Sequence, residues 1–258
     1  MRNSVLGVML IFSMVFFSKV QAGYVADFEA WDKKANNKQH LRLTSDGTNA
    51  SVLFNADSEQ PFGIYKVNGV TYSAQRDQGQ WRVINLDEMM KNLEMIGALQ
   101  GSAKTPAARQ IVLQDMKQEV RVGEYQGNLY KVIENEGGKV VKESTLVASK
   151  HEDVVRVRDD YMALFETAVK RASKFNAGNR DFDNMMTARE AMQRANGGIL
   201  RFESVDGGFT LLSIEPAAVK VALPAPPQNP LAVIGAAKPE EIKKGLEAAI
   251  DMLNNGTK

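Results

Sequence analysis

The chain has 258 residues, with 32 lysines and arginines against 31 aspartates and glutamates, and it contains no cysteine. The lack of cysteine excludes a disulfide framework, a thiol nucleophile and a thiolate metal site. A charge balance this close to neutral provides no long-range field for nucleic acid, so we expect no nucleic-acid partner.

The first 22 residues have the pattern of a secretory signal peptide. Arg2 supplies the positive charge, an apolar run extends from Val5 to Phe17, and Ala22 is the small residue that a signal peptidase requires. We therefore expect cleavage before Gly23 and a periplasmic protein of a Gram-negative bacterium, or a secreted one, with no transmembrane anchor after cleavage. The alternative is a membrane anchor, but a span takes about 20 apolar residues, and Lys19 ends this run early.

Residues 24 to about 149 alternate between apolar and polar side chains. Ala26, Phe28 and Ala30, for example, alternate with Asp27 and Glu29. This period of two predicts strands with one buried face. Asn-Gly at positions 68–69 lies between two such runs and predicts a hairpin with a type I′ turn, because both turn positions need a positive φ. The pattern indicates a meander of antiparallel hairpins.

Helical periodicity interrupts the strands once and then follows them. We expect a short helix over 86–97 that is capped by Asn85, and longer helices over 151–176 and 183–195. A last hairpin is expected from Ile199 to Ile214, with its turn at Asp206-Gly207-Gly208.

The composition changes after residue 215. Four prolines within residues 224–230 predict an extended linker, and an amphipathic helix is expected over 240–253. We therefore divide the chain into a signal peptide (1–22), a main domain (23–215) and a tail (216–258). The tail either docks on the main domain or reaches a partner.

The chain offers few groups for catalysis or metal binding. His40 and His151 have no acidic or histidine partner at ligand spacing in the sequence, and each is expected to be a surface residue. Asp159 and Asp160 are adjacent on a helix and diverge by about 100°, so they cannot share a proton. Phosphate-binding glycine loops and nucleophile elbows are absent. We expect no enzyme, no cofactor and no metal, and keep a hydrolase as a remote alternative.

Apolar side chains are more informative. Tyrosines and Trp81 occur in the strand-rich half, and methionines are frequent in the expected helices. Methionine is flexible and polarizable, so such helices facing a sheet can line an adaptable apolar cavity. The alternative is that these side chains only fill a core.

Three stretches resemble a known group of proteins. They are the hairpin of residues 64–72 with its continuation over 81–86, the glycine and aromatic strand of residues 122–132, and the closing hairpin of residues 198–214. Their order is similar to that of the LolA-like superfamily of periplasmic lipoprotein carriers, and most similar to a related secreted domain family of unknown function. The resemblance implies an α+β fold in which a strongly curved antiparallel sheet, an unclosed barrel, has helices on its concave face.

The resemblance also implies a function. We expect a non-catalytic carrier or sensor for an apolar ligand, such as a lipid or a lipoprotein acyl chain. The expected ligand contacts are Phe28, Leu43, Ile64, Tyr72, Trp81, Met89, Leu93 and Phe165. The alternative function is an interaction module of the cell envelope, with a filled core and a tail that binds a cell-envelope protein.

Overall fold

A computed structural model describes residues 23–34, 36–96, 109–172 and 189–228 of the chain. These residues form one sheet of eleven strands in the order β6-β5-β4-β3-β2-β1-β11-β10-β9-β8-β7. All neighbours are antiparallel, and β6 and β7 are the two edges, so the sheet is open. The predicted antiparallel, unclosed sheet is thereby confirmed.

The elements follow the chain in this order: β1 (Tyr24–Asp32), β2 (Asn37–Ser45), β3 (Ala50–Phe54), β4 (Phe62–Val67), β5 (Val70–Asp77), β6 (Gln80–Asn85), α1 (Leu86–Ile96), β7 (Arg109–Val122), β8 (Tyr125–Glu136), β9 (Lys139–Ser149), α2 (Glu152–Ala172), β10 (Gly198–Glu203) and β11 (Gly207–Pro216). Residues 189–195 form a further helical segment. The expected signal peptide and the expected helix over 240–253 lie outside the described residues.

Local sequence signals explain several of these boundaries. Asn68 and Gly69 have φ values of 52° and 78°, as the predicted type I′ turn between β4 and β5 requires. The side chain of Asn85 accepts a hydrogen bond from the backbone N–H of Glu88 over 3.0 Å, which caps α1 as expected. Lys117, at φ 56°, lies in an irregularity of β7 that disrupts its pairing with β8.

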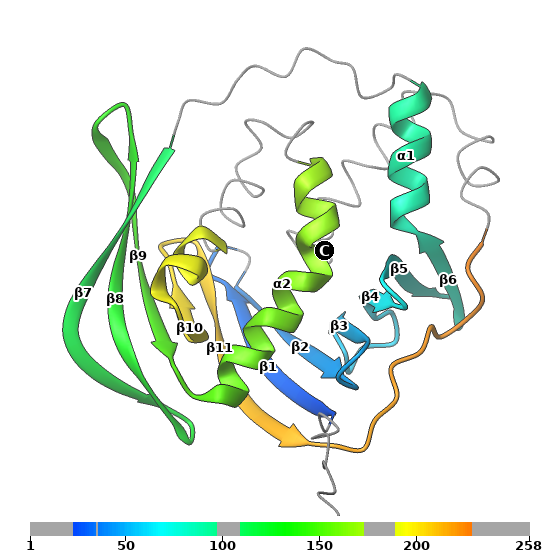
Figure 1. The fold of residues 1–258 in the computed structure, drawn as a ribbon, viewed down its shortest axis with the longest axis horizontal. Coiled ribbons are helices and arrows are strands. Elements are labelled where there is room, and N and C mark those ends of the chain that lie inside the picture. Colours follow the sequence, from blue (N-terminus) through cyan, green and yellow to red (C-terminus); the bar gives the residue numbers. More distant parts are fainter. Residues whose placement is uncertain (1–22, 35, 97–108, 173–188, 229–258) are drawn as a thin grey trace, which may run out of the picture.

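The sheet bends around α2. Figure 1 shows β7, β8 and β9 on one side of this helix and β3 to β6 on the other. Val154, Val157 and Leu164 of α2 are buried in the main core together with residues from β1 to β4 and β11. Lys66 of β4 adds a polar contact, because its Nζ donates to the carbonyl oxygen of Ala163 over 3.3 Å. Packing against several strands therefore fixes α2 over one face of the sheet.

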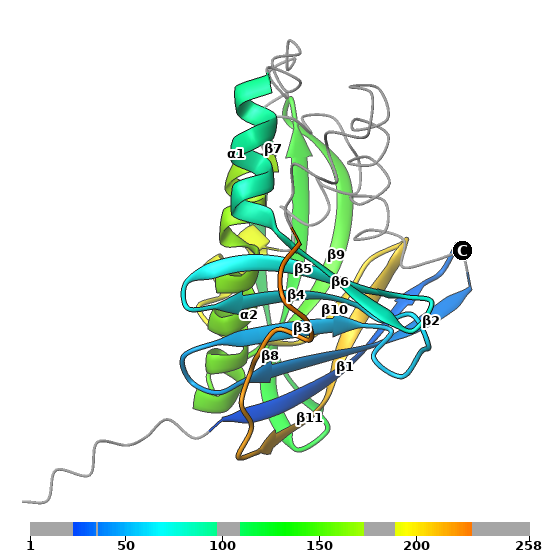
Figure 2. The same ribbon diagram turned by 90° about the vertical axis from the view of Figure 1, so that its right-hand side faces the viewer.

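The opposite face of β3 to β6 is covered by the chain that follows β11. Residues 217–228 carry Val221, which is 5% exposed and packs in a cluster with Tyr65, Ala74 and Val83. Figure 2 shows this segment in orange, crossing in front of the strands with α2 behind them. We call residues 217–228 the strap.

Backbone hydrogen bonds hold the strap at three points. The N–H of Ala217 donates to the Gly23 carbonyl over 2.9 Å, and the N–H of Gln228 donates to the Val83 carbonyl over 2.8 Å. Between them, the N–H of Val221 donates to Asp46 Oδ2 over 3.0 Å. The described part of the tail is therefore docked on the main domain.

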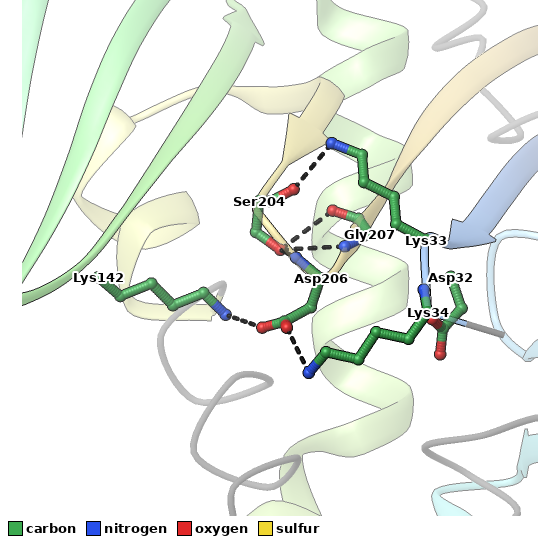
Figure 3. A network of polar contacts seen from close by, with 7 residues as sticks. All are labelled: Asp32, Lys33, Lys34, Lys142, Ser204, Asp206 and Gly207. Carbon is green, nitrogen blue, oxygen red and sulfur yellow. Dashed lines mark hydrogen bonds and ion pairs between the residues drawn. The ribbon is translucent and has the colours of Figure 1, made fainter. Parts of the chain in front are cut away.

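A polar network joins two turns and strand β9 at one end of the sheet (Figure 3). Asp206, in the β10–β11 turn, pairs with Lys34 at 2.6 Å and with Lys142 of β9 at 3.3 Å. Lys33 donates to the Ser204 carbonyl over 3.1 Å. The bond to Lys34 and the positive charge of both lysines lower the pKa of Asp206 below its ordinary value. The network links the turn after β1 to the β10–β11 hairpin and to β9.

Candidate ligand-binding site

An apolar cavity of about 90 Å³ lies between the sheet and α2. Its walls come from β1, β2, β3, β10 and β11 on one side, and from α2 and the helical segment 189–195 on the other. The lining residues are Phe28, Ala30, Leu41, Val52, Val157, Arg158, Tyr161, Met192, Ile199 and Phe209. This volume is several times the space that one water molecule needs, yet it is below the roughly 300 Å³ at which typical ligand pockets begin.

The register of the strands explains which residues form the sheet side of the cavity wall. Phe28 of β1 pairs with Leu41 of β2, and Ala30 pairs with Phe209 of β11. Side chains two positions apart on a strand share a face, so Phe28 and Ala30 face α2 together. The rings of Phe28 and Phe209 meet edge to face at 6.3 Å. Ala30 is the smallest lining residue, and its methyl group leaves room between these rings and α2.

The spacing of residues along α2 explains the helix side of the cavity wall. Val157 and Tyr161 are four positions apart on α2 and therefore share one helix face. Burial raises the pKa of Tyr161 to about 12, so its hydroxyl stays protonated and neutral at working pH. Met192, 6% exposed, closes the cavity from the segment 189–195. Its unbranched thioether side chain can change rotamer at little cost.

Arg158 is the one charged side chain of this cavity lining, and it lies next to Val157. Its Nη1 donates to the Gly197 carbonyl over 3.1 Å, and its Nε and Nη2 donate to Asp159 Oδ1 over 2.9 and 2.7 Å. The Arg158 side chain is 17% exposed, whereas that of Asp159 is 61% exposed. The arginine side chain is therefore more buried than the carboxylate that pairs with it.

The structure distributes the eight predicted ligand contacts over several places. Phe28 lines the cavity. Leu43 and Ile64 are 0% and 2% exposed and belong to the same core, beside the cavity but not in its lining. Tyr72 and Trp81 lie on the opposite face, in the cluster that the strap covers. Met89 is half-buried on α1, and the side chains of Leu93 and Phe165 lie outside the described part of the structure.

Most of the lining residues were not among the predicted ligand contacts. Ala30 follows Phe28 at the interval of two that marks a shared strand face, and this signal was present in the sequence. Met192 belonged to the methionine-rich helix. Arg158 had no such signal, because an arginine on a helix with many charges is ordinarily a solvated residue.

His40 is partly exposed, and it has acidic partners that its neighbours in the sequence did not indicate. Its Nε2 lies 2.9 Å from Asp27 Oδ1, its Nδ1 contacts Asp57 Oδ2, and Arg42 Nε donates to the same Asp27 oxygen over 2.9 Å. These acids are 13 and 17 positions away in the chain, so no local spacing could reveal them. Among the described residues, no group of three or more histidines and acids is arranged to hold a metal ion.

His151 stays exposed, as predicted. It lies in a separate polar depression near the start of α2, with its ring edge to face with Tyr125 at 5.1 Å. Ser149 and Asp153 are also there, but Ser149 Oγ donates to the Gln126 carbonyl over 2.7 Å. The hydroxyl is thus directed at the backbone rather than at the His151 ring.

Comparisons with known proteins add little. No family model and no curated protein matches the chain. Among solved structures, PNGF-II in a C2 crystal form aligns with 84% of this chain, and the alignment covers 30% of the PNGF-II chain. The TM-score is 0.32 and the sequence identity is 6%.

Within the described residues, no helix combines the length and hydropathy needed to cross a bilayer. The resemblance to LolA-like carriers stays a prediction.

Proposed function

We propose that this protein is a non-catalytic binding protein that shields an apolar group, such as the end of an acyl chain, between its sheet and α2. The observation that carries the proposal is the apolar cavity beside Phe28, Ala30 and Tyr161. Well-packed interiors have few voids larger than a water molecule, so space of this size at the centre of the fold suggests a ligand. The signal-peptide pattern of residues 1–22 supports a place of action in the periplasm.

The size of the cavity limits what enters it without rearrangement. At about 30 Å³ for each water-sized group, 90 Å³ takes about three methylenes. Three buried methylenes contribute about 2.4 kcal/mol, less than the cost of at least about 4 kcal/mol for immobilising a ligand. A longer chain therefore requires Met192 to turn away, or α2 and the segment 189–195 to separate from the sheet.

The alternative function, a partner-binding tail, has less support. Its expected helix over 240–253 lies outside the described residues, and the strap lies on its own sheet rather than extending from it. We therefore retain the binding protein as our proposal.

A cavity-filling substitution tests the proposal. We expect the purified protein to enhance the fluorescence of Nile red, an uncharged apolar dye that is larger than the cavity and enters it only with the rearrangement of Met192 or α2, and Ala30→Leu to weaken this binding at least tenfold by filling the cavity. Ala222→Leu makes the same change at an exposed position of the strap and serves as the control. Dye binding that is absent from the wild type, or equal in both variants, would contradict the proposal.

A further inference from the structure

The position of Arg158 specifies the ligand more closely. We propose that the ligand is a single-chain fatty acid whose carboxylate binds the Arg158 guanidinium at the rim of the cavity while its tail enters the apolar space. This inference rests on the proposed function and adds the class of ligand.

The wall of the cavity is almost wholly apolar. Nine of its ten lining residues carry no charge, and the tenth, Arg158, adds little polar surface to the wall, so its guanidinium lies at the edge of the apolar space. An arginine has five N–H donors in a planar fork that matches a carboxylate. The bonds to Gly197 and Asp159 use its Nη1, Nε and Nη2 atoms once each, so one N–H on each terminal nitrogen is left for a ligand oxygen.

Asp159, which pairs with Arg158 in the structure, would compete only weakly with a ligand carboxylate for the guanidinium. Asp159 is the next residue in the chain and its side chain is 61% exposed. An ion pair with so exposed a partner is worth about 0 to 1 kcal/mol, because water screens it. A fatty-acid carboxylate held over the apolar cavity would be less screened and would displace Asp159 from part of the guanidinium.

An anchor at Arg158 would add to the small apolar contribution of the cavity. The apolar space alone contributes too little to offset the cost of binding, as calculated above for three methylenes. A charge-assisted hydrogen bond is about twice as strong as a neutral one. An anionic head at Arg158 therefore supplies the affinity that the small cavity lacks.

The test compares octanoate with octanol, which share a chain and differ in head group, by isothermal titration calorimetry. We expect the wild type to bind octanoate at least tenfold more tightly than octanol. Arg158→Gln should remove this preference, and Arg158→Lys should restore part of it. Asp159→Asn should strengthen octanoate binding about threefold and leave octanol unchanged, an effect that a merely structural arginine would not produce.

Arg194→Gln is the matched control. Arg194 lies on the segment 189–195, pairs with Glu190 at 2.6 Å and does not line the cavity, so its removal should change neither affinity. Equal binding of octanoate and octanol by the wild type would overturn the fatty-acid inference and leave the apolar site intact. Absence of binding for both compounds would overturn the proposed function as well. Thermal melts of each variant show whether it is folded.

Discussion

The hydroxyl of Tyr24 donates a hydrogen bond to Asp160 Oδ2 over 2.8 Å, although the two residues are 136 positions apart. Tyr24 is 1% exposed at the start of β1, and Asp160 lies in the middle of α2. The guanidinium of Arg156 lies 4.4 Å from the centre of the Tyr24 ring. One strand residue thereby ties the middle of α2 to the start of β1.

Removal of this hydroxyl should destabilise the fold. A hydrogen bond to a charged group contributes about 1.5 kcal/mol or more, so Tyr24→Phe should lower the free energy of unfolding by about 1.5 kcal/mol in urea titrations. Burial and the Asp160 carboxylate raise the pKa of Tyr24 far above its ordinary value, so the effect should be the same from pH 6 to 9. Tyr72→Phe, which removes a hydroxyl under the strap, is the control, and an equal loss there would contradict this role of Asp160.

Phe28 and Trp81 should respond differently to truncation, because they lie on opposite faces of the sheet. Phe28 lines the cavity, whereas Trp81 packs near Val221 of the strap. We expect Phe28→Ala to change Nile red affinity at least fivefold and to cost about 3 kcal/mol of stability. Trp81→Ala should cost about 2 kcal/mol, since it is only partly buried, and leave dye affinity unchanged. A loss of dye binding in Trp81→Ala would mean that the apolar site extends to the strap face.

The placement of Phe28 and Trp81 on opposite faces of the sheet shows how far the sequence could predict the site. Alternation along the strands correctly predicted an antiparallel sheet, and Asn68-Gly69 and Asn85 correctly predicted a turn and a helix cap. Ile64 and Tyr65, however, are adjacent and both buried, because α2 covers one face of β4 and the strap covers the other. A period of two separates two faces but does not say which of them a distant helix covers, so Phe28 and Trp81 were assigned to one cavity.

The pairing around Asp206 predicts a pH dependence. Lys34 and Lys142 lower the pKa of Asp206, so their contribution to stability is present above the unfolded-state pKa of about 3.9 and is lost as pH falls through the lower folded-state value. Asp206→Asn should therefore destabilise the protein by about 1 to 2 kcal/mol at pH 7 and reduce its acid sensitivity below pH 4. Glu203→Gln removes the more exposed pair with Lys33 and should cost less than about 0.5 kcal/mol. Equal losses of stability in the two variants would show that the burial of Asp206 does not strengthen its ion pairs.

Docking of the strap should depend on the charge of Asp46. Burial alone would raise the pKa of Asp46, but hydrogen bonds from the backbone N–H groups of Asn49, Val221 and Thr48 outweigh it and lower the pKa to about 2. Because the folded-state pKa is the lower one, this contribution is complete above about pH 4 and disappears as pH falls toward 2. The strap should therefore leave the sheet in acid while the rest of the fold persists.

Trp81 can report this release, since it packs in the cluster beneath the strap. In a Trp31→Phe background, its emission should shift to the red between pH 4 and 2, with no matching change in far-ultraviolet circular dichroism. Asp46→Asn replaces one acceptor oxygen by an NH₂ group, so it should be red-shifted already at pH 7 and be cut faster by trypsin after Lys220. Glu59→Gln, an exposed carboxylate in the loop between β3 and β4, should behave like the wild type. If emission and circular dichroism instead change together, the strap does not separate before the fold is lost, and Asp46 acts on the stability of the whole domain.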